Sequence, residues 1–464
     1  MRIPSSALDA LRDIVGADAV LLDLPARAAH SADSLERVSA LPDVVVVPAD
    51  AAQVARVMQW CVAHRVPLTP RGGGTGYSGG AVPVLGGVVL SMARFTRILE
   101  IDEHNLLAVV EPNVITADLQ AAVEARGLFY PPDPQSMTEC AIGGNIAENA
   151  GGPRAFKYGV TRQYVLGLEV VLPTGERIET GGRTVKNVVG YDLTQLLIGS
   201  EGTLGIITRA TLRLIPKPEA RATLQAAFPS IAAAARAVDE FVVRRVVPAT
   251  IEIIDGMCLD AVERLLDDAS LQLHGIPAML LVDVDGSQAQ VAQDLGSADD
   301  ACRAAGATWC RVATDADERE HLWAVRRQLS PALKMIAPYK VNNDIVVPKG
   351  RIPELFALVT DLRERYGLPI PSFGHAGDGN IHVNVMVPDP GDARQMERAE
   401  AAQADLFDGV IALGGVISGE HGIGVTKSAY IGRNLSADAI ALMKRVKQAF
   451  DPHGLLNPGK IFPE

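Results

Sequence analysis

The chain is organised around the stretch Pro70-Arg71-Gly72-Gly73-Gly74-Thr75-Gly76-Tyr77-Ser78-Gly79-Gly80. Six of its eleven residues are glycine, so the backbone can adopt positive φ angles and a ligand can approach bare amides. Successive amides that point into one concavity form an anion nest, and this stretch adds three hydroxyls and one guanidinium. The stretch predicts a phosphate-binding loop that is long enough for a pyrophosphate. A flexible linker is the alternative, and the apolar run at 87–90 that follows disfavours it.

Two familiar phosphate-binding loops do not fit this stretch. Residues 74–79 spell Gly-x-Gly-x-x-Gly, but the dinucleotide fingerprint needs a helix that opens inside it. Pro83, Gly86 and Gly87 exclude that helix. A nucleoside-triphosphate loop would end in Gly-Lys-Ser/Thr, which this sequence lacks. We therefore expect a nucleotide site of another kind, and a nicotinamide-dependent enzyme is disfavoured.

Composition limits the class of protein and its partners. At 464 residues the chain is too long for one ordinary core, so two or more domains are expected. The excess of 55 acidic over 43 basic residues argues against a nucleic-acid partner and a polybasic membrane anchor. Five cysteines without a CxxC pair argue against a disulfide framework and a thiolate-bound iron–sulfur cluster. Because no signal core or membrane-length apolar run occurs, we expect a soluble, cytoplasmic protein.

Two further stretches are rich in small residues. Residues 130–152 begin with a proline-rich, extended entry and continue with two Gly-Gly pairs around two asparagines. This density of glycine and asparagine indicates close approach to a flat, polar ligand, with a turn-rich loop as the alternative. Residues 198–208, Ile-Gly-Ser-Glu-Gly-Thr-Leu-Gly-Ile-Ile-Thr, again offer backbone amides and a carboxylate ahead of a strand.

Hydrophobic patterns predict the elements that carry these stretches. A buried strand is predicted at 44–47, followed by a helix that runs to about His64. Asp50 is expected to cap this helix, with Gln53 completing a capping box. From about residue 221 to 340, strand-like and helix-like runs alternate, which predicts an α+β domain with an antiparallel sheet.

Histidine and glutamate gather in two glycine-rich segments of the second half. The first carries His375 on a loop and then a strand, on which His382 and Asn384 project from one face. The second places Glu420 beside His421 in a loop. Two histidines and one glutamate are a usual ligand set for an open, catalytic divalent-metal site. An isolated histidine is more often an ordinary core or surface group, and the remaining histidines lack such company.

The three glycine-rich stretches, in this order and spacing, resemble the flavin domain of the vanillyl-alcohol-oxidase superfamily. The resemblance runs from about residue 42 to 462 and points to the D-2-hydroxyacid dehydrogenase branch, which includes D-lactate dehydrogenase, D-2-hydroxyglutarate dehydrogenase and the glycolate oxidase flavin subunit. It implies an α+β fold, with a PCMH-type FAD-binding domain of two subdomains and an α+β cap with an antiparallel sheet. It also implies an FAD-binding domain at 1–218, a substrate or cap domain at 219–412, and a C-terminal segment at 413–464 that returns to the FAD domain.

The resemblance implies that FAD lies along these stretches, with the pyrophosphate in the first, the flavin ring and ribityl chain on the second, and the adenosine part at the third. The first stretch lacks the His or Cys that binds flavin covalently in some relatives, and Cys140 matches a cysteine of non-covalent members. A dissociable FAD is therefore expected. The residues implied in FAD binding are Arg71, Gly72, Gly73, Gly74, Thr75, Gly76, Tyr77, Ser78, Gly79, Pro134, Ser136, Thr138, Gly143, Gly144, Asn145, Asn149, Gly151, Glu201, Gly202, Gly205, Ile207 and Asn457.

The same resemblance assigns roles to the polar residues of the second half. His375, His382 and Glu420 match metal ligands, for which zinc is expected and manganese is the alternative. Asn384 and His421 match positions that contact the substrate, and His421 is the implied catalytic base. The chemistry agrees, because a metal-bound α-hydroxyl has a lowered pKa and a neutral histidine can take its proton. The α-hydride would then pass to the flavin.

A carboxylate clamp is implied at 323–330. Arg326 matches a substrate arginine, with a helix-surface charge as the alternative, and Ser330 stands where 2-hydroxyglutarate enzymes have threonine. Those enzymes have a lysine two residues before an aspartate, whereas Lys340 stands four residues before Asp344. Strand residues two apart face the same side, so Lys340 remains within reach as a substrate-binding residue. The departure weakens the case for a second-carboxylate pocket and favours a short monocarboxylate such as D-lactate.

The predicted function is an FAD- and divalent-metal-dependent dehydrogenase that oxidises a D-2-hydroxyacid, with D-lactate favoured, to the 2-oxoacid. The alternatives are D-2-hydroxyglutarate dehydrogenase, an oxidase that uses oxygen directly, and the flavin subunit of a glycolate-oxidase-type complex. The expected electron acceptor is external: a quinone, an electron-transfer flavoprotein or an iron–sulfur subunit. We expect no integral membrane segment, membrane association only through a partner, and a homodimer as the oligomer to consider.

Overall fold

The computed structural model describes residues 3–463 except 36, 269–270, 272 and 314. The chain forms two compact units. The first unit consists of Met1–Gly151, Val160–Lys217 and Glu420–Glu464, and the second unit consists of Gly152–Gly159 and Pro218–Gly419. Among the described residues, no helix combines the length and the apolar character needed to cross a membrane. The domain boundaries expected from the sequence remain predictions, because compactness alone does not assign FAD or substrate to a unit.

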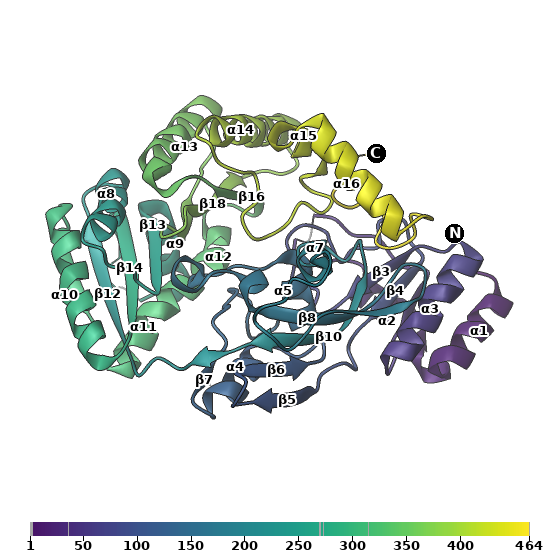
Figure 1. Ribbon diagram of the computed structural model, residues 1–464. Helices are drawn as coiled ribbons and strands as arrows, with labels where there is room; N and C mark the ends of the chain where they lie inside the picture. The colour runs from purple at the N-terminus through teal and green to yellow at the C-terminus, as the bar shows by residue number, and fades with distance from the viewer. Residues whose placement is uncertain (1–2, 36, 269–270, 272, 314, 464) are drawn as a thin grey trace. The chain divides into compact units, whose positions relative to one another are not determined.

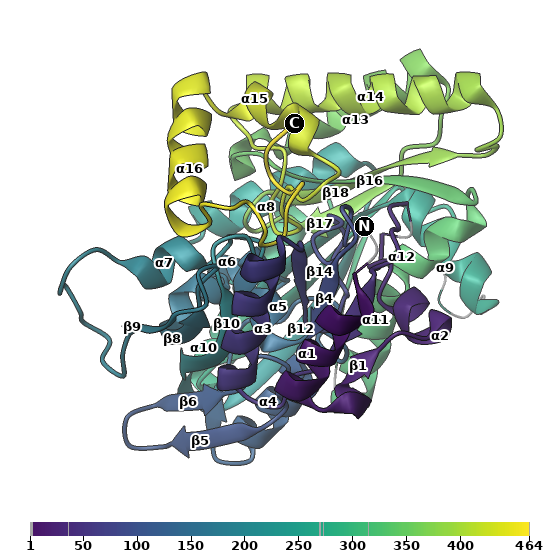
Figure 2. The same ribbon diagram turned by 90° about the vertical axis from the view of Figure 1, so that its right-hand side faces the viewer.

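The first unit begins with a four-stranded sheet and three helices, whose bounds are α1 Ser5–Val15, β1 Val20–Leu21, α2 Leu24–Ala29, β2 Val44–Val46, α3 Ala51–His64, β3 Leu68–Arg71 and β4 Val88–Ser91. The strand order is β1-β2-β4-β3, and β2 and β3 both run parallel to β4. All three residues of β2 are buried, as expected for a parallel strand that is covered on both faces. α1 and α3 lie side by side and share a hydrophobic core with this sheet (Figures 1 and 2).

The first unit continues with an antiparallel sheet, a strand pair and short helices, whose bounds are β5 Ile98–Asp102, β6 Leu107–Val110, α4 Thr116–Glu124, β7 Leu128–Phe129, α5 Ile142–Glu148, β8 Val165–Val171, β9 Arg177–Gly181, α7 Leu193–Leu197, β10 Ile206–Arg213, β11 Ile215–Pro216, α15 Ile431–Asn434 and α16 Ala437–Phe450. The sheet has the order β5-β6-β10-β8-β9, and β7 pairs with β11. β10, the strand predicted to follow the third glycine-rich stretch, therefore lies in the middle of this sheet.

The second unit is built on a seven-stranded antiparallel sheet with the order β15-β12-β14-β13-β17-β18-β16. Its elements are α6 Ala155–Tyr158, β12 Ala220–Phe228, α8 Ile231–Val243, β13 Thr250–Asp255, α9 Gly256–Leu266, β14 Ala278–Gly286, α10 Gln288–Ala304, β15 Trp309–Val312, α11 Ala316–Arg327, α12 Leu329–Ala332, β16 Tyr339–Val346, α13 Ile352–Tyr366, β17 Ser372–His375, β18 Asn380–Val387 and α14 Ala393–Ala412. The predicted α+β class with an antiparallel sheet is confirmed.

The two faces of this sheet differ in chemistry. Side chains alternate along a strand, so Ile253 points to one face and Glu252 to the other. The helices α8, α10 and α14 pack against the Ile253 face, and α13 and α14 lie side by side (Figures 1 and 2). On the opposite face, Val325 of α11 and Leu329 of α12 pack with Phe373 of β17 in a hydrophobic cluster. We call this second side the Glu252 face, and it carries most of the polar side chains described below.

The predicted capping box of α3 is only half correct. Asp50 caps the helix as predicted, since its carboxylate accepts a hydrogen bond from Gln53 N at 2.8 Å. The return bond differs, because Gln53 Oε1 accepts from Ala49 N at 2.7 Å instead of from Asp50 N. The helix ends at His64 as predicted, and Arg65 follows in the left-handed conformation with φ 55°.

The second glycine-rich stretch contains a short helix that its pattern of glycine and asparagine did not predict. α5 covers Ile142–Glu148 and includes both members of a Gly-Gly pair, which are weak helix formers. Tertiary contacts outweigh this preference: Asn145 Nδ2 donates to Thr116 Oγ1 at 2.7 Å, and Asn149 ends the helix in the left-handed conformation. The second glycine-rich stretch is therefore a helix end as well as a loop.

Candidate active site

The glycine-rich loop at 72–80 lies in the first unit between β3 and β4. Gly74 and Gly79 have φ angles of 70° and 78°, which glycine adopts without the strain that a side chain would bring. A Cβ at Gly73 would come within 2.8 Å of Glu139 O, so this loop packs directly against the second glycine-rich stretch. The loop presents backbone to its surroundings, as an anion nest requires.

Asn457 connects the glycine-rich loop to the third stretch. Its Nδ2 donates to Gly80 O at 3.0 Å and to Glu201 O at 2.8 Å. The Glu201 carboxylate in turn accepts hydrogen bonds from Ile423 N at 2.7 Å and Gly424 N at 2.6 Å. The first loop, the third stretch and the C-terminal segment are thus held together within the first unit by side chains that the sequence had singled out.

The residues of the second stretch fit a bound FAD. A Cβ at Gly143 would lie 2.6 Å from Pro112 Cβ, so packing requires glycine there. Gly144 is exposed, and outside its own helix no described atom lies within 4 Å of a Cβ placed on it. Asn113 Oδ1, near Gly72, is buried and accepts no hydrogen bond from the described residues. An open glycine and an unsatisfied buried acceptor are features that a bound cofactor would use.

Burial perturbs three charged groups in this part of the first unit. Burial and the neighbouring Glu201 raise the pKa of Glu148 well above its usual value, and burial also raises the pKa of Glu201. A Cβ at Gly422 would fall on Glu148 Oε2 and lie 3.0 Å from Glu201 Oε1, so both carboxylates converge on that glycine. Burial lowers the pKa of Lys460 to about 8, although the charges of Glu201 and Asp33 oppose this shift.

His421 is oriented by its neighbours in the first unit. Its ring stacks on Tyr77 of the glycine-rich loop, with ring centroids 5.2 Å apart and an interplanar angle of 22°. Its Nε2 lies 3.8 Å from Glu420 Oε1. A Cβ at Gly151 would lie 2.8 Å from Glu420 Oε2, so this predicted FAD residue packs against a predicted metal ligand. The structure thereby brings the implied base, one implied ligand and two implied FAD residues together.

The second unit brings the other two implied metal ligands together on the Glu252 face. The rings of His375 and His382 have centroids 5.5 Å apart at an interplanar angle of 86°, and both residues are buried. Asp344 lies opposite His382 in the β16–β18 register, with its Oδ1 3.8 Å from His382 Nδ1. Two imidazoles and a carboxylate suit zinc or manganese, so the residues fit a divalent metal. Asp344 Oδ2 also accepts a hydrogen bond from Gly419 N at 2.9 Å.

A buried carboxylate that the sequence analysis missed joins two implied site residues. Glu252 Oε2 accepts from Arg326 Nε at 2.5 Å, and Glu252 Oε1 lies 2.5 Å from His375 Nδ1. Burial alone would raise the pKa of Glu252, but Arg326 and His375 outweigh it and lower the pKa to about 2. Arg326 is 3% exposed and its guanidinium lies 5.0 Å from the Phe373 ring centroid, so the helix-surface alternative for Arg326 is wrong.

Lys340 and Asn384 lie on the same face. Lys340 Nζ donates to Ser330 Oγ at 3.0 Å, which joins two residues implied in substrate binding. Asn384 Oδ1 accepts from Asn342 Nδ2 at 2.8 Å. The register pairs Asn342 with Asn384 and Asp344 with His382, so the four-residue offset of Lys340 from Asp344 keeps the lysine on the Glu252 face.

The remaining implied FAD residues stay predictions. Thr138 is exposed in the loop before α5, and Ile207 lies in β10, where it pairs with Val170. Cys140 is buried, and its Sγ lies 3.3 Å from Thr116 Oγ1. None of these contacts assigns or excludes a role in cofactor binding.

Two functional candidates escaped the sequence analysis, for different reasons. Glu252 stands between Ile251 and Ile253 in the fully buried strand Thr250–Asp255. A carboxylate flanked by isoleucines in a buried strand is a usable signal, because a buried charge is costly unless it is paired. Asp344 gave no comparable signal, since it ends the polar run 342–344, and only the strand register places it beside His382.

Comparisons with known proteins define the class. The family described as FAD binding domain matches residues 42–181, and the family described as FAD linked oxidases, C-terminal domain, matches residues 217–461. The chain belongs to this family of FAD-linked oxidases and is an FAD-dependent oxidoreductase.

Similar proteins narrow the class further. Glycolate oxidase subunit GlcD of Bacillus subtilis (strain 168) is 44% identical over 437 residues, 94% of this chain and 92% of the relative. D-lactate dehydrogenase of Anaerostipes hadrus is 36% identical over 427 residues, 91% of this chain and 90% of the relative. The crystal structure of p-cresol methylhydroxylase with substrate bound matches with a TM-score of 0.80 at 18% identity, over 98% of this chain and 96% of that one, which shows a shared fold. The predicted PCMH-type fold and the family resemblance are confirmed, and the chain is an FAD-linked oxidoreductase of the D-lactate, glycolate or D-2-hydroxyglutarate type.

Proposed function

We propose that the protein uses dissociable FAD and a divalent metal to oxidise a short D-2-hydroxyacid, D-lactate or a relative, to the 2-oxoacid. The observation that carries this proposal is the Glu252 face of the second unit, on which one sheet collects His375, His382, Asn384 and Lys340. Two imidazoles, an amide and an ammonium group on one rigid face suit a metal and a substrate carboxylate together.

The metal would be held by His375, His382 and Glu420, with Asp344 as a neighbouring carboxylate. The spacing of the two imidazole rings supports the first two assignments. Glu420 follows Gly419 directly in the chain. Gly419 N donates a hydrogen bond to Asp344 Oδ2 at 2.9 Å, which supports a place for Glu420 in this ligand set. When bound, a divalent metal lowers the pKa of an α-hydroxyl, and FAD supplies the hydride acceptor. Zinc fits this nitrogen and oxygen donor set, and manganese is the alternative.

The residues of the chain bind, orient and deprotonate the substrate. His421, in its neutral form, accepts the hydroxyl proton on an imidazole nitrogen. Its stacking on Tyr77 limits the orientations of the ring. Arg326 and Lys340 offer N–H groups to the substrate carboxylate, and Asn384 offers an amide to the polar end. Fixing the α-carbon by several contacts lowers the entropic part of the barrier.

The spacing of Lys340 favours a monocarboxylate. Lys340 stands four residues before Asp344, whereas 2-hydroxyglutarate enzymes have a lysine two residues before an aspartate. The other cationic side chain, Arg326, is already paired with Glu252 at 2.5 Å. Both observations weaken the case for a pocket that holds a second carboxylate. D-2-hydroxyglutarate is therefore the less favoured substrate.

A second candidate function is the flavin subunit of a glycolate-oxidase-type complex. The 44% identity to glycolate oxidase subunit GlcD over 94% of this chain favours it. The electrons would then pass to an external acceptor: a quinone, an electron-transfer flavoprotein or an iron–sulfur subunit. An iron–sulfur cluster would have to lie on the partner, because the five cysteines of this chain show no cluster spacing.

The test is anaerobic reduction of the bound flavin by a panel of hydroxyacids. Acid precipitation should first release FAD into the supernatant, whereas yellow colour in the pellet would contradict a dissociable cofactor. D-lactate should bleach the flavin faster than L-lactate and D-2-hydroxyglutarate. Glycolate as the fastest substrate, together with a copurifying iron–sulfur protein, would favour the second candidate. No bleaching by any hydroxyacid would overturn both.

A further inference from the structure

Glu252 is a fully buried carboxylate on β13 for which the proposed chemistry needs no role. Its side chain is 0% exposed, and its two oxygens contact two different residues of the candidate site. We infer that Glu252 is a positioning residue that fixes the metal ligand His375 and the substrate-binding Arg326 in one shared geometry. This inference rests on the proposed function and adds a link between the metal site and the carboxylate clamp.

Glu252 determines which nitrogen of His375 is available to a metal. Its Oε1 lies 2.5 Å from His375 Nδ1, so Nδ1–H donates to the carboxylate in the neutral imidazole. The lone pair then remains on Nε2, which becomes the ligating atom. A carboxylate behind a ligating histidine also fixes the orientation of the ring and makes it a stronger ligand.

Glu252 also determines which part of Arg326 is available to a substrate. The Nε–H group donates to Oε2 at 2.5 Å, which leaves the two terminal NH₂ groups for another partner. The guanidinium is confined between the sheet and α11, because it lies 5.0 Å from the Phe373 ring centroid and is 3% exposed. A planar group held at Nε presents its terminal nitrogens in a fixed direction, which suits recognition of a carboxylate.

The β13–β17 register favours one joint role for Glu252 over two separate roles. Glu252 pairs with His375 across the β13–β17 ladder, so the carboxylate and the imidazole share a face through backbone hydrogen bonds alone. Arg326 arrives from a different element, α11. One carboxylate therefore joins the metal ligand, which is fixed by the sheet, to the clamp residue, which is fixed by a helix. A displacement of His375 would therefore shift Arg326 through Glu252, and a displacement of Arg326 would shift His375.

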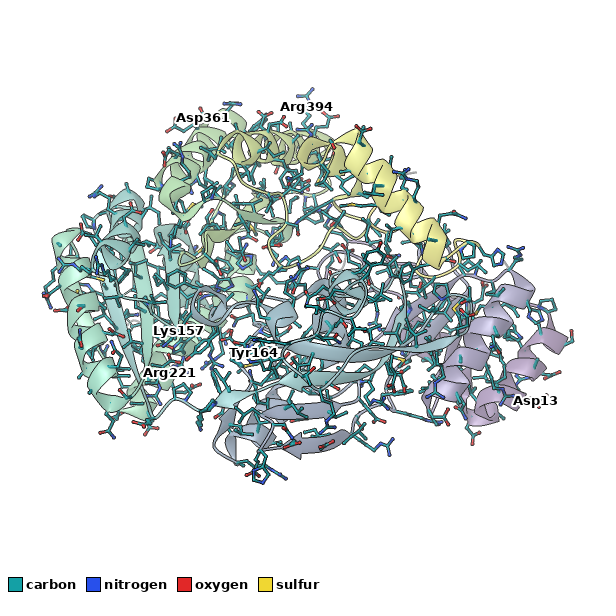
Figure 3. All side chains as sticks on the ribbon, in the orientation of Figure 1. Asp13, Lys157, Tyr164, Arg221, Asp361 and Arg394 are labelled. Atoms are coloured by element: carbon teal, nitrogen blue, oxygen red, sulfur yellow. The ribbon has the colours of Figure 1, made fainter. Side chains whose placement is uncertain are left out.

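The same sheet face offers a matched control in Asp283 of β14. Asp283 is also 0% exposed, accepts from Arg221 Nε at 2.7 Å and accepts from Trp323 Nε1 at 3.1 Å. Figure 3 labels Arg221, the partner of this second pair. Among the described residues, Asp283 accepts hydrogen bonds from Arg221, Thr223 and Trp323, none of which is an implied ligand or substrate residue. Its loss therefore tests burial of a paired carboxylate without the proposed positioning role.

The experiment compares Glu252→Gln and Glu252→Asp with Asp283→Asn in the full-length protein loaded with FAD. The measurements are the dissociation constant for zinc, by competition with a chelating dye, the KM for D-lactate and the Tm. Glu252→Gln should weaken zinc binding by about 10–100-fold, as loss of a carboxylate behind a ligating histidine does. It should also raise KM, with the FAD spectrum unchanged. Asp283→Asn should lower Tm and leave zinc affinity and KM at wild-type values.

The outcomes separate this inference from the proposed function. Wild-type protein that binds no zinc and is not reduced by any hydroxyacid would overturn the proposed function itself. Wild-type protein that does both, beside a Glu252→Gln variant with unchanged zinc affinity and KM, would overturn the positioning role alone. If Glu252→Gln does not fold, Glu252→Asp decides. The shorter carboxylate cannot span both partners, so it should show a smaller loss in zinc affinity and a raised KM, and unchanged values would again overturn the inference.

Discussion

The two units build their candidate sites from different materials. In the first unit the site is mostly backbone: Gly74 and Gly79 adopt positive φ angles, and Asn457 braces the loop by bonding to carbonyl groups. In the second unit it is mostly side chain, with Glu252 and His375 paired across a sheet. A backbone-built site needs particular residues at particular positions, whereas a side-chain site needs a particular strand register. The backbone-built site can therefore be recognised from the glycine pattern in the sequence. The side-chain site can be recognised only when the strand register is known.

The largest effect is expected when the metal is removed from the side-chain site of the second unit while FAD stays bound to the first unit. Removal of metal by a chelator, or His382→Ala, should abolish flavin reduction by hydroxyacid, because the α-hydroxyl then keeps its high pKa. FAD should stay bound, since His382 belongs to the second unit and the implied FAD residues belong to the first. The measurement is single-turnover bleaching alongside metal and FAD content. The control is His274→Ala, whose side chain is 80% exposed. Full activity in a metal-free preparation would contradict the metal site.

The next effect separates the catalytic base from the ligands. His421→Ala should retain both metal and FAD but reduce kcat by about 10²–10⁴-fold, the usual contribution of a general base. Metal content and single-turnover rates should be measured for His421→Ala and His382→Ala together. Loss of metal from both variants would make His421 a ligand instead of the base.

The sequence predicted the backbone site better than the side-chain site. The buried strand predicted at 44–47, the helix that ends at His64 and the cap at Asp50 all lie where the sequence pattern placed them. Helix α5 was missed, because two glycines weaken local preference while contacts such as Asn145 with Thr116 restore it. Glu252 was missed, since its partners lie 74 and 123 residues away along the chain. A sequence pattern that spans a few residues does not reveal pairs of residues so far apart in the chain.

Adjacent glycines of α5 offer a sharper test of the backbone site. Gly143→Ala should destabilise the FAD-free protein, because the new Cβ would lie 2.6 Å from Pro112 Cβ. Gly144→Ala has open space around it and exchanges a weak helix former for a strong one, so the Tm of the FAD-free protein should hold or rise slightly. If Gly144 lies against FAD, its variant should weaken FAD binding by about tenfold, or ~1.4 kcal/mol. Fluorescence titration with FAD measures this, and an unchanged affinity would remove Gly144 from the cofactor site.

An effect of similar size, on stability instead of FAD binding, is expected at Lys460, a charged side chain inside the backbone-built site. Lys460 is 4% exposed, and its Nζ donates to Val82 O at 2.8 Å. Burial lowers its pKa from 10.5 to about 8, against the opposing charges of Glu201 and Asp33. Between these two values the unfolded chain still binds a proton that the folded chain has released. By linkage, the contribution of Lys460 to the free energy of unfolding must rise with pH across that window and stay constant below it, where both states are protonated.

Lys460→Met removes this titration and keeps much of the side-chain volume. The wild-type protein should therefore gain about 1.5 kcal/mol of unfolding free energy relative to the variant between about pH 8 and about pH 9.5. Urea unfolding of both proteins at the two pH values, with FAD present, measures the difference. A difference that does not change with pH would mean that the amine stays protonated in the folded protein. In that case Glu201 and Lys460 form an ion pair that outweighs burial, and the first unit depends on paired side chains as the second does.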